Sequence, residues 1–414
     1  MAHFLLALPA PFGNLNAMTT SHFTLLLEAA LLSCGLFIFP LVSRADEKLP
    51  AADALRATAQ LPDPFLLKDG SRVTTVAQWN AHRAELKELI LSYEYGHLPP
   101  ASAVKADVGA GHADPSTGAV ETQVTLHVGP AGQIPVKMVI TSPAGNGPFP
   151  VILKGDLVWG RVLPAIVANV NKHGYMLVEF DRTDFAPDKN EAPGGVRPLY
   201  PEYDFATLAA WAWGYHCSID YLLTRADVDP KRIVITGHSR GGKATLLAGA
   251  LDERVALTAP NASGCGGSGC YRFQAKGSEQ IQDILKNFPY WFKSDFNQFI
   301  GKTDRLPFDQ HTLKALVAPR ALFTTESQGD LWANPEGTQL TLMAAREVYK
   351  FLGVPEKIGT HYRQGKHDQN EQDFAALLDF ADHLFAGTLQ GGTFVDLPYK
   401  DAPKAFDWTA PAKP

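Results

Sequence analysis

The sequence predicts an α/β protein, a three-layer αβα sandwich with a mostly parallel central sheet. Three observations support this fold. Alternating or apolar runs typical of strands come first, at 121–128, 135–141 and 150–155, and we expect them to form a meander. Later strand-like runs are separated by helical or loop segments, as in βα units. These later runs are 175–180, 232–236, 255–260 and 320–326. A short glycine-containing turn joins one of them directly to a helical stretch.

Helical patterns lie before and between the predicted strands. Residues 79–96 have the apolar spacing of a helix. The stretch 198–223 becomes helical, and we expect it to pack beside the turn at 237–241, with Trp211 and Trp213 in the core rather than in a ligand site. Antiparallel strands followed by βα units are the pattern of the α/β-hydrolase fold.

The turn at 237–241 has the G-x-S-x-G pattern of a nucleophile elbow. Glycine fits positions 237 and 241 because the strand reverses so sharply that a Cβ at either position would collide with neighbouring backbone. The turn lifts the Ser239 hydroxyl out of the sheet, and the next helix directs its free N–H groups to where an oxyanion forms. A structural glycine turn is the alternative, but the preceding strand and following helix favour a serine hydrolase.

An acid and a base are expected later in the chain, in the order serine, acid, histidine. Asp330 follows the strand 320–326, and His367 lies in a loop beyond the strand-like 358–363. Because a serine hydroxyl is a poor nucleophile at neutral pH, His367 would accept its proton while a buried Asp330 orients the imidazole ring. We therefore predict Ser239 as nucleophile, Asp330 as acid and His367 as base. A solvated loop aspartate and a surface histidine are the alternatives.

Other residues fit these roles less well. His361 falls inside a strand and His383 inside a helical run, while His238 is expected to pack or to form a hydrogen bond within the turn. Glu326 still lies in its strand, and Asp368, next to the predicted base, is poorly placed to reach the base's ring. The two carboxylates remain weaker alternatives for the acid.

Composition narrows the class of partner. The 414 residues are 45% hydrophobic and 19% charged, enough for one large α/β domain. The net charge is −6 and no run rich in lysine and arginine occurs, so nothing suggests nucleic acid or an anionic membrane as partner. No C-x-x-C or clustered His/Cys pattern indicates zinc, and we expect no metal and no cofactor. Cys217, Cys265 and Cys270 are expected to be buried and inert.

The N-terminal segment is typical of an export signal. Residues 23–42 form an apolar stretch interrupted by Glu28, and residues 43–45, Ser-Arg-Ala, offer a small-x-small cleavage site. We predict a signal peptide over 1–45, a single catalytic domain over 46–414, and a secreted or periplasmic location. An uncleaved membrane anchor is the alternative.

A glycine-rich segment at 264–269 matches G-x-G-x-x-G, a pattern of dinucleotide-binding turns. No helix-forming stretch opens directly from it, and no acid lies about 20 residues on at a second strand end. We therefore interpret the segment as a loop that lines the pocket near the elbow.

Several longer motifs occur together in a fixed order. They are GHSRGGK (237–243), NASGCGGSGCYR (261–272), FPYWF (288–292), LPFDQH (306–311), GDLWANPEG (329–337) and GKHD (365–368). On these motifs the chain resembles the bacterial glucuronoyl esterases, carbohydrate esterase family fifteen, from about residue 60 onward. The resemblance implies an α/β-hydrolase fold and cleavage of the esters that join the 4-O-methyl-glucuronate of xylan to lignin alcohols.

The resemblance also implies roles for individual residues. Ser239 would be the nucleophile and His367 the base, and Arg240 would help to form the oxyanion hole. The residues that would hold sugar hydroxyls are Lys243, Glu279 and Trp332. Lys243 lies one helical turn after Ser239 and can share its face. A solvated lysine, a surface carboxylate and a core tryptophan are the alternatives for these three positions.

One position and one segment depart from the family pattern. Many members carry a glutamate before the Ser-Gly pair of the glycine-rich loop, where this chain has Ala262. Other members rely on a carboxylate after the later strand, where this chain has Asp330, the same residue that chain order indicates. The segment KGDLVWG at 154–160 also differs from what the family leads us to expect.

Taken together, the sequence predicts a serine esterase that hydrolyses 4-O-methyl-glucuronoyl esters linking xylan to lignin alcohols, through an acyl-enzyme. We expect glucuronoxylan or a lignin–carbohydrate ester as substrate, no stable membrane partner, and a monomer. An acetylxylan or general carboxylic-ester hydrolase is the nearest alternative, which the three sugar-holding residues disfavour. A carbohydrate-binding protein with a decayed site is another alternative, which the presence of Ser239, Asp330 and His367 disfavours.

Overall fold

A ten-stranded mixed sheet forms the centre of the protein. In order across the sheet, its strands are β1 (Lys105–Val108), β3 (Val120–Val128), β4 (Ile134–Ser142), β6 (Met176–Phe180), β5 (Phe149–Lys154), β7 (Val228–His238), β8 (Leu257–Asn261), β9 (Ala321–Ser327) and β10 (Ile358–Arg363). The short β2 (His112–Ala113) pairs with β3 outside this path. Pairing is antiparallel from β1 to β6 and parallel from β6 to β10. The predicted mostly parallel sheet is confirmed.

The computed structural model describes residues 49–101, 104–190 and 194–412. The predicted signal peptide over 1–45 therefore lies outside the described residues. The described residues belong to the compact unit Leu49–Pro414. Among the helices of the described ranges, none has both the length and the apolar character needed to cross a membrane.

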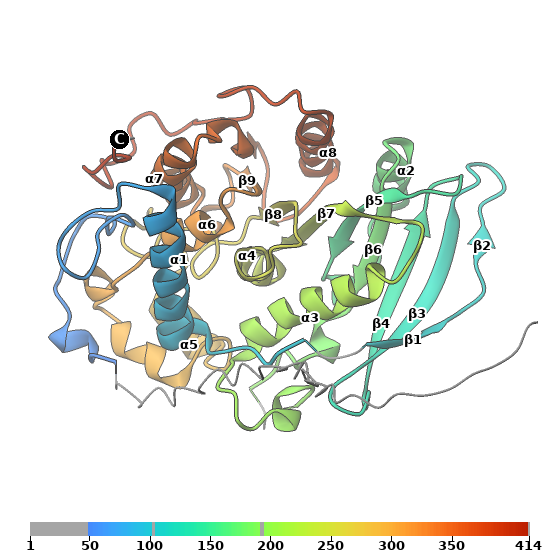
Figure 1. Ribbon diagram of the computed structural model, residues 1–414, viewed down its shortest axis with the longest axis horizontal. Coiled ribbons are helices and arrows are strands. Elements are labelled where there is room, and N and C mark those ends of the chain that lie inside the picture. The colour runs from blue at the N-terminus through green and yellow to red at the C-terminus, as the bar shows by residue number, and fades with distance from the viewer. Residues whose placement is uncertain (1–48, 102–103, 191–193, 413–414) are drawn as a thin grey trace, which may run out of the picture. The chain divides into compact units, whose positions relative to one another are not determined.

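Helices pack against both faces of the sheet (Figure 1). The helices α2 (Pro164–Lys172) and α8 (Glu371–Ala386) contact each other and one face. The other face is covered by α3 (Thr207–Leu222), α4 (Arg240–Leu251), α6 (Gln310–Val317) and α7 (Pro335–Leu352), with α1 (Val76–Ile90) packed on α6. The short α5 (Ile281–Asn287) lies between β8 and α6 in the chain. This arrangement gives the three layers that the sequence predicts.

Central strands are apolar on both faces because helices bury both sides of a parallel sheet. In β5, Val151 and Leu153 point into the larger core with α3 and α4, whereas Ile152 joins the smaller core beneath α2 and α8. All three side chains are fully buried. The apolar run of β5 therefore contributes side chains to both hydrophobic cores.

The predicted meander of the first three strand-like runs is wrong for the third run. β3 and β4 pair antiparallel as expected, but β6 is inserted between β4 and β5. Because β5 runs parallel to β6 and β7, it belongs to the parallel half of the sheet. A strand buried on both faces carries no period-2 signal that would reveal its neighbours.

The turn from β7 to α4 has the predicted elbow geometry. Ser239 has φ 56° and ψ −123°, outside the regions that most L-residues adopt, and α4 begins at the next residue. A Cβ at Gly237 would lie 2.7 Å from the Gly241 carbonyl oxygen, as expected for backbone crowding. A Cβ at Gly241 would instead lie 2.0 Å from Oδ1 of Asp156, so a side chain and not backbone excludes it.

Gly241→Ala tests how rigidly this turn is held. The added methyl group would have to displace the buried Asp156 carboxylate, so we expect a loss of at least about 2 kcal/mol of unfolding free energy. The measurement is urea unfolding followed by circular dichroism. Gly391→Ala is the matched control, because no atom lies within 4 Å of its added Cβ. Equal stability of the two variants would contradict the tight packing of Asp156 on the elbow.

Candidate active site

The structure brings Ser239, His367 and Asp330 into one hydrogen-bonded series. Oγ of Ser239 lies 2.8 Å from Nε2 of His367, and Nδ1 of His367 lies 2.5 Å from Oδ2 of Asp330. The Asp330 side chain is 3% exposed, whereas the His367 side chain is 39% exposed. This is the geometry of a nucleophile, a base open to substrate, and a buried carboxylate that orients the base.

Three loops at the carboxyl ends of the parallel strands carry these side chains. Ser239 follows β7, Asp330 follows β9, and His367 follows β10. The His367 loop is fixed from below by Arg363, whose guanidinium donates to the carbonyl oxygens of Gln364 and Asp368. The loops therefore meet at one edge of the sheet, where α/β folds place their ligands.

A buried ionic cluster lies beneath the elbow. Oδ2 of Asp156 accepts the backbone N–H of His238 at 2.8 Å and a hydrogen bond from Lys154, while Oδ1 accepts from Nη1 of Arg182 at 2.7 Å. Burial by itself would raise the pKa of Asp156, but Lys154 and Arg182 outweigh it and hold that pKa below its usual range. Asp156 is therefore a charged anchor for the elbow backbone.

The same cluster reaches the histidine loop. Nζ of Lys154 donates to Oε1 of Gln369 at 2.5 Å, and Nε2 of Gln369 donates to Oγ1 of Thr236 at 3.0 Å. Gln369 lies two residues after His367, and Thr236 lies in β7 three residues before Ser239. One network thus connects the supports of the nucleophile and of the base.

His238 packs against the base. Its ring centroid lies 4.4 Å from that of His367, and its Nδ1 donates to Oδ1 of Asn261 at 2.6 Å, since Nδ2 of Asn261 already donates to Thr325. Burial first, and then the neighbouring His367, lower the pKa of His238 to about 4. His238 therefore stays neutral over the range in which most histidines titrate.

The Arg240 side chain is held in one orientation by a carboxylate and two aromatic rings. Its Nη1 donates to Oδ2 of Asp188 at 2.7 Å, and its guanidinium carbon lies 4.7 Å and 4.8 Å from the ring centroids of Phe288 and Trp291. Oδ1 of Asp188 accepts from the Tyr290 hydroxyl and the Trp291 indole. Burial opposes ionisation, but the bonds from Trp291 and Arg240 hold the pKa of Asp188 below its usual range.

The three predicted sugar-holding residues also come together. Nζ of Lys243 donates to Oε2 of Glu279 at 3.0 Å and to the carbonyl oxygens of Ser263 and Cys265 at 2.7 and 2.5 Å. These contacts use all three ammonium protons, and Lys243 is 3% exposed. The backbone N–H of Glu279 donates to the carbonyl oxygen of Trp332, whose side chain is 49% exposed.

The weaker alternatives for base and acid lie elsewhere. Glu326 is fully buried in β9, where burial raises its pKa, and Asp368 pairs with Arg363. His361 lies within β10, and His383 bonds to a carbonyl oxygen of its own helix, α8. None of the hydrogen bonds of the described residues joins these four side chains to Ser239.

The glycine-rich segment 264–269 forms a loop between β8 and α5. Its bridge pairs Cys265 with Gly269, and the carbonyl oxygen of Cys265 binds Lys243. The loop thus contacts Lys243, one of the residues predicted to hold the sugar. The cysteines of the described part of the chain are free and buried, as predicted; they are Cys217, Cys265 and Cys270.

Sequence reasoning missed Asp156 and Asp188. The unusual segment 154–160 gave a signal for Asp156, but its bond to His238 spans 82 positions and no spacing rule connects them. Asp188 lies in an irregular stretch after β6 with no motif around it. Both carboxylates act through tertiary contacts that only the folded chain creates.

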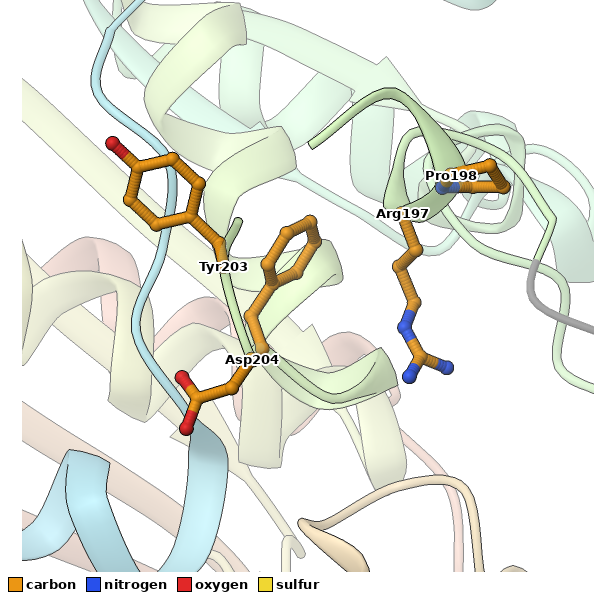
Figure 2. Close-up of a pocket in the computed structure, with 5 residues that line it drawn as sticks. Arg197, Pro198, Tyr203 and Asp204 are labelled. Atoms are coloured by element: carbon orange, nitrogen blue, oxygen red, sulfur yellow. The ribbon is translucent and has the colours of Figure 1, made fainter. Parts of the chain in front are cut away.

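A cavity of about 360 Å³ lies apart from the catalytic candidates, which do not line it. Its lining residues are Arg197, Pro198, Tyr203, Asp204 and Phe205. Figure 2 shows these side chains on the segment that precedes α3. The carboxylate of Asp204 is already bound by His97 and Lys293.

Comparison with known proteins identifies the family. A family model described as the glucuronyl esterase of fungi matches residues 128–353. A carbohydrate esterase from an unknown prokaryotic organism is 33% identical over 390 residues, covering 79% of this chain and 90% of that protein. The chain belongs to the glucuronoyl esterases. It is a carboxylic-ester hydrolase, as the sequence predicts.

Other members of the glucuronoyl esterase family agree with this placement. The 4-O-methyl-glucuronoyl methylesterase 1 of Wolfiporia cocos is 31% identical, covering 83% of this chain and 86% of that one. A family 15 glucuronoyl esterase from Caldicellulosiruptor kristjansonii superposes with a TM-score of 0.69 at 31% identity, over 84% and 98% of the two chains. A glucuronoyl esterase variant from Sporotrichum thermophile, solved with methyl 4-O-methyl-β-D-glucopyranuronate, superposes with a TM-score of 0.69 at 27% identity, over 85% and 97%.

The neutral state of His238 predicts a pH dependence of stability. Its folded pKa of about 4 lies below the value of about 6.5 for an unfolded histidine, so the unfolded chain binds more protons between these pH values. Stability is therefore lost as pH falls from about 6.5 towards 4. At pH 5 this residue alone should account for about 1–2 kcal/mol relative to pH 7.5.

His238→Gln tests this dependence by urea unfolding at pH 7.5 and pH 5. The variant keeps a donor for Asn261 but cannot titrate, so its loss of stability on acidification should be smaller than that of the wild type by the amount above. His112→Gln, at an exposed position in β2, is the matched control and should leave the loss unchanged. Identical losses in wild type and His238→Gln would contradict a neutral, partly buried His238.

Proposed function

We propose that this protein hydrolyses 4-O-methyl-glucuronoyl esters that link xylan to lignin alcohols, with Ser239 as nucleophile, His367 as base and Asp330 as acid. The observation that supports it most strongly is the series of short contacts from Ser239 through His367 to Asp330 in a chain of the glucuronoyl esterase family. Relatives named 4-O-methyl-glucuronoyl methylesterases support the choice of acyl group.

Acylation begins when Ser239 attacks the ester carbonyl carbon. Its hydroxyl proton passes to Nε2 of His367, and the imidazolium is stabilised by the carboxylate of Asp330 at Nδ1. His367 then returns the proton to the leaving alcohol as the C–O bond breaks. Water enters and attacks the acyl carbon while His367 accepts its proton. His367 then returns that proton to Oγ of Ser239 as the ester bond to the enzyme breaks, which releases the free uronic acid.

The start of α4 stabilises the developing oxyanion. The backbone N–H of Arg240 follows the nucleophile at the first position of the helix, where it has no intrahelical acceptor. The Arg240 guanidinium adds positive charge nearby, and its contacts with Asp188 and the Phe288 ring hold it in a fixed orientation. A donor that is positioned in advance needs no reorganisation during the reaction.

Glu279 and Trp332 bind the uronate sugar, and Lys243 supports Glu279. Because its three protons are used by protein oxygens, Lys243 acts by fixing Oε2 of Glu279. Glu279 is then left with Oε1 as an acceptor for sugar hydroxyls. Trp332, half exposed, offers its ring face or indole N–H to the sugar.

The chain is proposed to act outside the cytoplasm, as a secreted or periplasmic monomer that needs no cofactor. The apolar segment 23–42 with its cleavage site supports export. Polymeric cell-wall substrates are consistent with a base and a tryptophan that are open to solvent at the site.

The test of this function is a substrate panel with purified protein. We expect kcat/KM on benzyl and methyl glucuronate to exceed that on methyl galacturonate and aryl acetates, and Ser239→Ala to retain less than about 1% of the activity. Circular dichroism should show an unchanged fold. A preference for aryl acetates would favour the general carboxylic-ester hydrolase instead.

Asp330→Asn tests the acid. We expect the fold and KM to change little and kcat on a glucuronate ester to fall by roughly 10²–10⁴, because an amide favours the wrong imidazole tautomer and cannot stabilise the imidazolium. Adding Ala262→Glu, at the family's other acid position, should restore part of the rate. Near wild-type kcat in Asp330→Asn would show that Asp330 is not the acid.

A further inference from the structure

The segment after β5 exposes several apolar side chains next to the active site. Trp159 is 51% exposed, Val158 is 38% exposed and Leu163 is 59% exposed. Single exposed apolar residues are ordinary, but three within six positions of one loop indicate a contact surface. None of these side chains has a role in the steps described above.

Trp159 is fixed from below by a buried cation. The guanidinium carbon of Arg182 lies 4.2 Å from the Trp159 ring centroid and 5.0 Å from that of Trp211, and Arg182 is fully buried. Nη1 of Arg182 is bonded to Asp156, while Nε and Nη2 have no hydrogen-bond partner among the described residues. Arg182 lies over the indole ring, and 51% of Trp159 still remains exposed.

Trp159 also lies next to the residues that handle the leaving group. Its ring contacts His238 edge-on with 6.0 Å between centroids, and His238 lies 4.4 Å from the ring of His367. In the proposed reaction His367 protonates the departing alcohol, so the alcohol oxygen must lie beside Nε2 of His367. The rest of the alcohol therefore begins beside His367, whereas the sugar portion of the ester is bound by Glu279 and Trp332.

We propose that the exposed part of the Trp159 ring is a subsite for the alcohol portion of the ester and favours aromatic alcohols. An indole face held rigidly by Arg182 offers offset or edge-on stacking to an aromatic ring at little cost in side-chain entropy. This inference rests on the proposed function, because it needs His367 as the proton donor to the alcohol.

The test compares benzyl with methyl glucuronate, which share the acid and differ in the alcohol. In Trp159→Ala we expect kcat/KM for the benzyl ester to fall about tenfold and that for the methyl ester to change less than about twofold. Trp159→Phe should keep most of the benzyl preference. Trp159→Leu keeps apolar cover over Arg182 without an indole face and should lose that preference.

Two controls separate the subsite from other effects. Trp332→Ala should lower kcat/KM for both esters alike, because it acts on the shared sugar. Val108→Ala removes a side chain that is 55% exposed in β1, at the opposite edge of the sheet from β10, and should change neither ester. Thermal unfolding of each variant shows whether the packing around Arg182 is intact.

Equal losses on both esters in Trp159→Leu would overturn the inference, since they would mean that Trp159 only supports Arg182 and His238. An unchanged benzyl-to-methyl ratio in Trp159→Ala would overturn it as well. Both outcomes leave the proposed function standing if the wild type hydrolyses the two glucuronate esters. A wild type that hydrolyses neither ester would overturn both the proposed function and this inference.

Discussion

The hydrogen bond from the backbone N–H of His238 to the buried carboxylate of Asp156 is the contact on which the site depends. A serine at φ 56° is strained, and such a conformation persists only where its surroundings hold it. Asp156 does so from beneath, kept ionised by Lys154 and Arg182. Because Lys154 also binds Gln369, movement of the elbow and of the histidine loop is restrained by one group of charges.

In the proposed mechanism the acid comes from the loop after β9. Ala262, where many relatives carry a glutamate, is 1% exposed with φ 41°, and its backbone N–H bonds to Thr325. A methyl group there cannot orient a histidine, whereas the buried Asp330 meets Nδ1 of His367 at 2.5 Å. A carboxylate that orients one histidine ring can thus come from either of two neighbouring strand ends, since both strands end at the same edge of the sheet.

Short sequence motifs predicted the features that depend on residues close together in the chain. The elbow, the chain order of Ser239, Asp330 and His367, and the parallel half of the sheet all follow from short motifs and from strand and helix periodicity. The neighbours of β5 and the anchoring role of Asp156 could not be predicted, because they depend on pairings between distant segments. The reason for glycine at position 241 could not be predicted either, because a side chain there would collide with a carboxylate 85 positions earlier in the chain.

The central claim, that Ser239 is an activated nucleophile in a uronate-binding site, is tested most directly by labelling with a fluorophosphonate. Intact and peptide mass spectrometry of the wild type should show one adduct, on Ser239, formed more slowly when 4-O-methyl-glucuronic acid is present and unaffected by galacturonic acid. Labelling of another residue, or no labelling of the folded protein, would contradict this account.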